Sequence, residues 1–367
     1  MAPRGDPAAS AGAASRRATR LVDIASALGL HVSTVSRVLN GDTSMSIRPE
    51  TAARVLAEAR SQGYRPNALA RALKRDRTGA IAFVIPMLRN PIWIRLQGGA
   101  LQRAAERGYV VMIMDEPTDE PRLPADYSYL VKESRADGLL LATALRPAAA
   151  RPAPVRADGA GWPLVPHVYV NRRGPDSGND VVMDEAGAMA LFVDHVATLG
   201  HRCLLVVDGP QEVDTVHRRV TAVRRHARAR GIAVTVRHAP ATEEGGFDVV
   251  RMLLRAGQFP TACGVGSLNQ LFGVLAALRE GGVSVPDEAS VVSFDEDQCL
   301  GFLDVPVTSV CMPLAQLGGA AVDALIARIE GTDAGQPAHR DVMVGEPMFL
   351  VPRASVAAPP ATTKGTR

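Results

Sequence analysis

The chain has 367 residues, 47% of them hydrophobic, which is too long for one ordinary domain and long enough for two or three. No apolar run reaches the ~18 residues of a membrane-spanning helix. The formal net charge of +3 conceals an asymmetry, because residues 1–78 hold 13 Lys and Arg against 6 Asp and Glu, whereas the remaining residues hold 28 against 32. A basic end on a slightly acidic body indicates a polyanionic partner for that end, although a solvated basic surface explains the same charge.

The N-terminal segment and the cysteines indicate a cytoplasmic protein. Residues 1–19 contain arginines but lack the apolar centre of a signal peptide, and we expect a disordered tail there. The cysteines show no CxxC or metal-like spacing, so we expect reduced thiols, no metal site and no cofactor. They are Cys203, Cys263, Cys299 and Cys311.

Two short helices are predicted after this tail. The first has an apolar stripe at i, i+3, i+4 and i+7, made of Leu21, Ile24, Ala25 and Leu28. Gly29 then breaks the pattern, because glycine takes a positive φ at low cost. The second helix has apolar Val35, Val38 and Leu39, and its other face is polar and basic. Such a pair, joined by a turn that contains glycine, is typical of proteins that enter the DNA major groove.

A third helix is predicted after a loop at Gly41–Ile47. Pro49 suits its first turn, and Glu50 suits the positive end of the helix dipole. We expect Gly63 to end this helix and Tyr64 to pack back on the three-helix core. The side chains expected to face that core are Val55, Leu56 and Ala59. The three helices form a predicted headpiece over residues 20–64.

The next segment, Arg65–Lys74, is a linker with helical potential. A helix this short is marginal in isolation. By themselves, Leu69 and Leu73 are expected to pack an ordinary helix, although an apolar Leu73 in a basic setting also fits a side chain that enters the DNA minor groove. We assign residues 65–78 to this linker.

From Gly79 the pattern alternates between apolar strands and helices, which predicts parallel sheets with helices on both faces. The expected strands are 80–86, 109–115, 138–143, 164–170, 203–207, 233–237, 262–266 and 291–295. The expected helices are 91–107, 185–199, 216–230, 247–255 and 270–281, and Pro147–Trp162 reads as an exposed loop. Two such units in tandem place a ligand site at the carboxyl ends of the strands. We expect this domain to cover residues 79–357 and a disordered tail to cover 358–367.

Four runs in the first part of the chain carry a family resemblance. DIA, TVSRVLN, PETAARVL and YRPNALARALK follow one another with the spacing of the lac-repressor (LacI/GalR) family of bacterial transcription regulators, which the chain resembles to about Ala357. The resemblance implies an α/β protein with an N-terminal three-helix helix-turn-helix headpiece, a hinge helix, and a two-lobed domain like the periplasmic binding proteins. It implies three crossings between the lobes. We expect the third near Pro306–Pro313, with helix Leu314–Ile329 returning to the N-terminal lobe.

The resemblance also implies which residues meet DNA. They are Val32, Ser33, Thr34, Arg37, Asn40, Asn67 and Leu73. Arg37 can donate two hydrogen bonds to a guanine edge, worth ~1–3 kcal/mol of discrimination, and the alternative for it is a phosphate contact. Thr34 and Asn40 hold phosphates or cap a helix. His31 departs from the family, because it replaces a capping serine and is a poorer cap that predicts a looser turn.

Effector contacts are implied for Ile92, Trp93, Asn171, Arg219, Ser267 and Asp295. Trp93 offers a flat face such as sugar and purine sites often have, and a core position is its alternative. Arg219 has a fork that suits hydroxyl or carboxylate groups. Ser267 and Leu268 replace the family's Asn-Asp pair, so the pocket is expected to take a less polar ligand, or none.

The sequence therefore predicts a sequence-specific repressor rather than an enzyme. We expect a homodimer, with a tetramer as the alternative, that binds a palindromic operator of double-stranded DNA under control of a sugar-like effector. Two other classes stay open: a ligand-binding transport protein, and an α/β enzyme with a DNA-binding segment. For the second, Gly264 and Gly266 give half of a dinucleotide fingerprint. His201 is expected to be a hydrogen-bonded structural residue.

Overall fold

The computed structural model describes residues 19–39, 47–64, 77–86, 88, 90–116, 127–142, 165–174, 180–332 and 348–360. The chain divides into two compact units, Met1–Arg77 and Thr78–Arg367. Among the described helices, none is by itself long and apolar enough to span a membrane. One pair, Leu21–Leu28 with Val32–Leu39, reaches that length and apolar composition only when the two helices are taken together, and they are bent by 113°. The expected loop Pro147–Trp162 lies outside the described residues, as do most of the expected tails 1–19 and 358–367.

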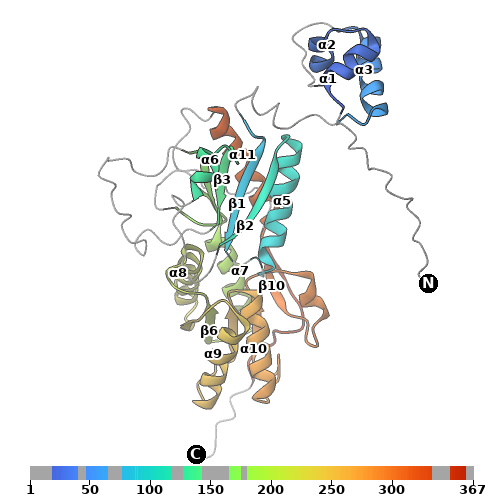
Figure 1. Cartoon of the computed structure of the whole chain (residues 1–367). Coiled ribbons are helices and arrows are strands. Elements are labelled where there is room, and N and C mark those ends of the chain that lie inside the picture. Colours follow the sequence, from blue (N-terminus) through green and yellow to red (C-terminus); the bar gives the residue numbers. More distant parts are fainter. Residues whose placement is uncertain are drawn as a thin grey trace, which may run out of the picture. The chain divides into compact units, whose positions relative to one another are not determined.

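The first unit contains the three expected helices, α1 (Leu21–Leu28), α2 (Val32–Leu39) and α3 (Pro49–Ser61), drawn in blue in Figure 1. Its buried side chains are Ile24, Ala25, Val35, Val55 and Ala59, and Tyr64 packs against them as expected. Gly29 ends α1 with a φ of 64°, which confirms the left-handed turn before α2. The prediction that Leu56 faces this core is wrong, because its side chain is 42% exposed.

The second unit opens with a five-stranded parallel sheet in the order β2-β1-β3-β4-β5 (Figure 1). Its strands are β1 (Ala80–Pro86), β2 (Val110–Glu116), β3 (Gly138–Leu141), β4 (His167–Val170) and β5 (Asp180–Val181). Helices α5 (Ile92–Glu106) and α6 (Tyr129–Lys132) lie in the connections. Neither α6 nor β5 was predicted from the sequence, because elements this short carry too little periodicity to be recognised.

A six-stranded sheet follows in the order β11-β10-β9-β8-β6-β7, with only β11 antiparallel to its neighbour among the described pairs. Its strands are β6 (Cys203–Asp208), β7 (Ala233–His238), β8 (Ala262–Val265), β9 (Ser290–Ser293), β10 (Thr308–Cys311) and β11 (Phe349–Val351). Its helices are α7 (Glu185–Thr198), α8 (Asp214–Ala229), α9 (Glu243–Arg255), α10 (Leu268–Glu280) and the short 3₁₀ helix η2 (Gln298–Phe302). The α/β fold class is therefore confirmed.

Helix α9 begins four residues before the expected start at Phe247. Thr242 caps it by accepting a hydrogen bond from the Gly245 amide. A Cβ atom at Gly246 would lie 2.2 Å from the Gln270 carbonyl oxygen of α10. A Cβ atom at Gly245 would lie 2.2 Å from the Pro240 carbonyl oxygen, so neither glycine of the run EEGG has room for a side chain, although both lie within the helix.

The chain crosses between the two sheets at three points. It passes to the second sheet between β5 and α7, and returns at Met312–Pro313 into α11 (Leu314–Glu330), which packs on α5, β3 and β4. The return of this helix to the first lobe is confirmed. The prediction that this crossing is the third is wrong. It is the second, because the chain crosses once more between α11 and β11.

Helices α5 and α11 approach each other through two glycines. A Cβ atom at Gly99 would lie 1.8 Å from the Ala315 carbonyl oxygen, and one at Gly318 would lie 2.1 Å from that of Leu96. Both helices flank the first sheet (Figure 1). We call the first sheet with α5, α6 and α11 the first lobe, and the second sheet with α7 to α10 the second lobe.

Candidate functional site

Helix α2 presents a polar face to solvent. Val32 and Ser33 are exposed, and Thr34 and Arg37 are half-buried. Val35 is fully buried in the core of this unit. Because residues four apart lie on the same side of a helix, Ser33 and Arg37 are neighbours on this face. Of the other residues expected at DNA, Asn40, Asn67 and Leu73 lie outside the described residues, as does most of the loop Gly41–Ile47.

His31 caps the first turn of α2. The Ser33 amide donates a hydrogen bond to His31 Nδ1 at 3.3 Å, and the Ser33 hydroxyl lies 2.7 Å from the same nitrogen. The Thr34 amide donates to the His31 carbonyl oxygen at 2.9 Å. A nitrogen that accepts from a backbone amide carries no proton, so the Ser33 hydroxyl also donates to it. The start of α2 therefore keeps a side-chain cap, supplied by His31.

In the second unit, Arg219 of α8 is buried against the carboxyl ends of two strands. Its Nη1 donates to the Gly266 carbonyl oxygen at 2.9 Å, and its Nη2 donates to Asp208 Oδ1 at 3.3 Å. Asp208 ends β6, and Gly266 follows the neighbouring strand β8. A Cβ atom at Gly266 would lie 2.0 Å from Asp208 Oδ1, so a glycine at this position leaves room for the carboxylate.

Two further carboxyl groups act on Arg219. Glu185 comes from α7, and Asp295 follows β9; both are almost fully buried. Burial raises the pKa of Asp295 to about 7, although Arg219 acts to lower it. Burial also raises the pKa of Glu185. For Arg219 burial disfavours the charged form, but Asp208, Glu185 and Asp295 together raise its pKa, so it stays a cation.

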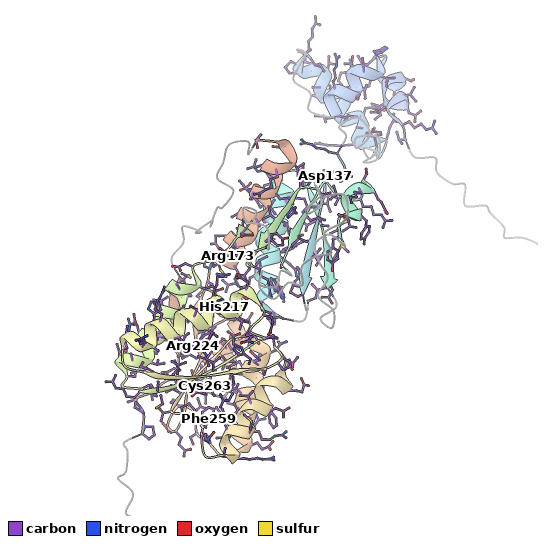
Figure 2. All side chains as sticks on the ribbon, turned by 90° about the vertical axis from the view of Figure 1, so that its left-hand side faces the viewer. Asp137, Arg173, His217, Arg224, Phe259 and Cys263 are labelled. Carbon is purple, nitrogen blue, oxygen red and sulfur yellow. The ribbon has the colours of Figure 1, made fainter. Side chains whose placement is uncertain are left out.

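Asn171 lies beside this cluster, at the junction of the two lobes. Arg218 of α8 donates to the Asn171 carbonyl oxygen at 3.2 Å and to Asp214 Oδ2 at 2.8 Å. Asp214 Oδ2 also accepts from the Arg173 amide at 3.1 Å. Figure 2 shows Arg173 where the first lobe meets the second. Asn171 has a φ of 61°, a left-handed conformation that asparagine tolerates better than most residues.

The remaining expected effector residues have other partners. The Ser267 hydroxyl accepts from the Gln270 amide at 3.3 Å and so caps α10. Leu268 is buried in a core cluster of the second lobe, so it does not make the site apolar. Trp93 is buried in the larger core cluster, in agreement with its alternative, and Ile92 is partly buried beside it. The structure thus brings Asp295 close to Arg219 and holds the Asn171 carbonyl oxygen against the adjacent Arg218.

Asp208 and Glu185 were not singled out from the sequence. Asp208 follows the apolar run Cys203–Val207, and a polar residue at the carboxyl end of a strand was the available signal. Glu185 carried no such signal, because its position in the first turn of α7 equally suits the helix dipole.

Other side chains that could bind a ligand include the four cysteines and His201. Among the described residues, no three His, Cys, Asp or Glu side chains are placed to hold a metal ion. All four cysteines are free, as expected. His201 Nδ1 lies 2.9 Å from Thr261 Oγ1, and its Nε2 lies 2.9 Å from the Ala357 carbonyl oxygen. The expectation of a hydrogen-bonded structural histidine is confirmed.

Comparison with known protein families gives two matches. Residues 20–67 match "Bacterial regulatory proteins, lacI family", and residues 193–356 match the "Periplasmic binding protein-like domain". The transcriptional regulator MalR of Streptomyces coelicolor is 30% identical over 352 residues, which cover 93% of this chain and 98% of that protein. The ribose operon repressor of Escherichia coli is 29% identical over 313 residues, which cover 84% and 92% of the two chains.

Solved structures agree with this result. The lac repressor dimer bound to operator and the anti-inducer ONPF has a TM-score of 0.77 at 22% identity, covering 93% of this chain and 100% of that one, and it supports the fold. The complex of the transcriptional regulator CelR with cellobiose has a TM-score of 0.65 at 26% identity, covering 92% of this chain and 99% of that one.

Proposed function

The chain belongs to the lacI family of bacterial regulatory proteins and is a DNA-binding regulator of transcription, and from this premise we propose that it is a repressor controlled by a small effector. The observation that carries the proposal is the outward face of α2, where the capped Ser33 lies one turn from Arg37. This face belongs to a compact unit separate from the one that contains the Arg219 cluster. We assign 20–64 to the headpiece, 65–78 to the hinge, 79–357 to the effector domain, and 1–19 and 358–367 to tails.

On DNA, α2 enters the major groove of one half-site. Arg37 donates two hydrogen bonds to a guanine edge, Ser33 contacts a neighbouring base, and Val32 touches a thymine methyl group. Thr34 and Asn40 hold phosphates and fix the register. The hinge brings Asn67 close to the DNA and inserts Leu73 into the minor groove. Thr34 and Arg37 are only half-buried, which supports these roles.

Dimerisation uses the outer surface of the first lobe. Ile94 of α5 is 67% exposed and Val110 of the edge strand β2 is 68% exposed, and Leu101 lies two turns from Ile94 on the same helix. Exposed apolar side chains gathered on one face favour a protein partner, and a second copy gives a closed twofold pair. Twofold symmetry in turn requires a palindromic operator. A tetramer is the alternative assembly.

The effector binds between the lobes and contacts Asn171, Arg219 and Asp295. The names of the relatives, a ribose operon repressor and a regulator in complex with cellobiose, favour a sugar or a related metabolite. The interlobe hydrogen bonds of Arg218 and Asp214 support this location, because a ligand there changes the relation of the lobes. The ligand shifts operator affinity by its differential affinity for the two lobe arrangements.

The protein carries out no chemistry of its own in this proposal and works in the cytoplasm, where its operator is.

Selection of duplexes from a randomised library tests the proposal. We expect the full-length protein to enrich a palindrome, whose symmetry reports the dimer. Arg37→Ala should relax the preference at one base pair in each half-site, at a cost of ~1–3 kcal/mol. Arg60→Ala changes an exposed arginine of α3 and serves as the control, which should keep the preference. Enrichment of no common sequence would refute the proposed function, and a uniform loss in Arg37→Ala would reduce Arg37 to a phosphate contact.

A further inference from the structure

The cluster around Arg219 holds more negative than positive charge. Glu185, Asp208 and Asp295 are each at most 3% exposed, and all three act electrostatically on Arg219. If all are ionised, three carboxylates against one guanidinium leave a formal charge of −2. Arg218 also acts on Glu185, but it is already paired with Asp214. A buried charge of this size needs a partner, because desolvation strongly disfavours unpaired ions.

The same side chains present more free acceptors than free donors. Within the cluster, the buried oxygen atoms without a hydrogen-bond partner are Glu185 Oε2, Asp208 Oδ2 and Asp295 Oδ1, and Oδ1 of Asn171, whose carbonyl oxygen binds the neighbouring Arg218, has none either. Against them stands one unpartnered donor of the cluster, Arg219 Nε. Buried polar atoms of native proteins are nearly always satisfied, so orphan atoms at one place indicate a missing partner. That partner must supply mainly hydrogen-bond donors.

A metal ion does not fit this description. No three acidic, histidine or cysteine side chains among the described residues lie close enough together to hold one. The carboxyl groups instead come from three separate places, the end of β6, the segment after β9 and the start of α7. An ammonium group tolerates such spacing, because its charge-assisted hydrogen bonds of about 2.7–2.9 Å are longer than the bonds of about 2.0–2.6 Å that a metal ion makes to oxygen.

We propose that the effector is an organic cation with several hydroxyl groups, of the chemical class of the amino sugars, and that Asp208, Glu185 and Asp295 surround its ammonium group. The inference rests on the proposed function, because it assigns a ligand class to the same site. Its hydroxyl groups donate to the remaining free acceptors and accept from Arg219 Nε. Without the cation, protons partly take its place, in line with the raised pKa values of Asp295 and Glu185.

Matched pairs of probes test the charge of the ligand. Glucosamine, galactosamine and mannosamine are compared with glucose, galactose and mannose by calorimetric titration and thermal unfolding of the full-length protein, with ammonium chloride as the salt control. We expect at least one amino sugar to bind about tenfold more tightly than its neutral parent, or ~1.4 kcal/mol. Equal or tighter binding of the neutral parents, or binding of no amino sugar, would overturn the proposal.

Two variants connect the preference to the cluster. Asp208→Asn should abolish the preference for the amine. Asp248→Asn removes an exposed carboxylate that pairs with Arg251 on α9, and it should keep the preference. In the absence of ligand, Asp208→Asn should also raise the melting temperature, because it removes one of the excess negative charges. A lower melting temperature, or an unchanged preference, would contradict the assignment.

Operator binding separates this inference from the proposed function. If the protein binds a palindromic operator and only neutral sugars change its affinity, the ligand class is wrong and the repressor function stands. If an amino sugar binds with the expected dependence on Asp208 but leaves operator binding unchanged, the ligand class stands and effector control fails.

Discussion

At the scale of single residues, His31 determines what Ser33 can offer to DNA. His31 Nδ1 accepts from both the Ser33 amide and the Ser33 hydroxyl, so the Ser33 hydroxyl oxygen can act towards DNA only as a hydrogen-bond acceptor. A lone pair accepts from the exocyclic amino groups of adenine or cytosine, which are donors in the major groove. In the proposed DNA contact, the histidine therefore influences base reading through Ser33.

His31→Ala should weaken the start of α2. The loss of a cap costs about 0.5–2 kcal/mol of helix stability, so the Ser33 amide should exchange faster with solvent and operator affinity should fall. Amide hydrogen exchange and operator titration measure the two effects. His31→Ser restores a good capping side chain and should recover the amide protection. If protection is equal in His31→Ala and the parent, the imidazole is not the cap.

Asp295 makes stability depend on pH. Burial raises its pKa to about 7 in the folded protein from an ordinary value of 3.8, with Asp208 and Glu185 adding to the rise and Arg219 opposing it. Between these values the folded state holds a proton that the unfolded chain has lost, so the free energy of unfolding falls as the pH rises from about 4 to about 7. Denaturant titrations over this range should show a shallower fall in Asp295→Asn. Parallel curves would show that Asp295 does not titrate as stated.

At the scale of elements, glycines determine how closely helices pack. Gly318 of α11 meets the backbone of α5, where a carbonyl oxygen cannot move aside as a side chain can. The neighbouring Gly319 faces only ordinary contacts, the nearest being Arg103 Cβ at 3.7 Å from an added Cβ. The close backbone of α5 therefore excludes a side chain at Gly318 but not at the adjacent Gly319.

Gly318→Ala should lower the free energy of unfolding by about 1–3 kcal/mol or more, because the added methyl overpacks the α5–α11 contact. Gly319→Ala is the matched control, and it should be neutral or stabilise by about 0.5–1 kcal/mol, since alanine is the better helix former. Urea denaturation of both variants measures the difference. Equal effects would mean that α5 and α11 can separate at little cost.

At the scale of the whole molecule, regulation requires that two compact units and two subunits act together. The site around Arg219 touches both lobes through Asn171 and α8, and the exposed side chains of Ile94 and Val110 lie on the first lobe. A change in the relation of the lobes therefore reaches the surface that we assign to the dimer. Effector control needs a contact between the lobes that has two alternative arrangements.

Ile94→Lys should dissociate the dimer, because pairing would bury an uncompensated charge. The dimer dissociation constant should rise at least about tenfold, or ~1.4 kcal/mol, and the affinity for a palindromic operator should fall with it. Sedimentation and operator titration measure these changes. Met252→Lys alters an exposed apolar residue of α9 in the second lobe and should leave both unchanged. An unchanged assembly in Ile94→Lys would move the interface elsewhere.

The sequence by itself determined the helices of the headpiece, most strands of both sheets and the family, because these follow from local periodicity, turn residues and short motifs. Only the tertiary structure decided that Leu56 is exposed, that Trp93 is in the core, and that Asp208 and Glu185 join Arg219. The physical reason is that burial and charge pairing depend on which strand ends and helices meet in space. These contacts join residues that are far apart in the chain, so they cannot be predicted from a local sequence pattern.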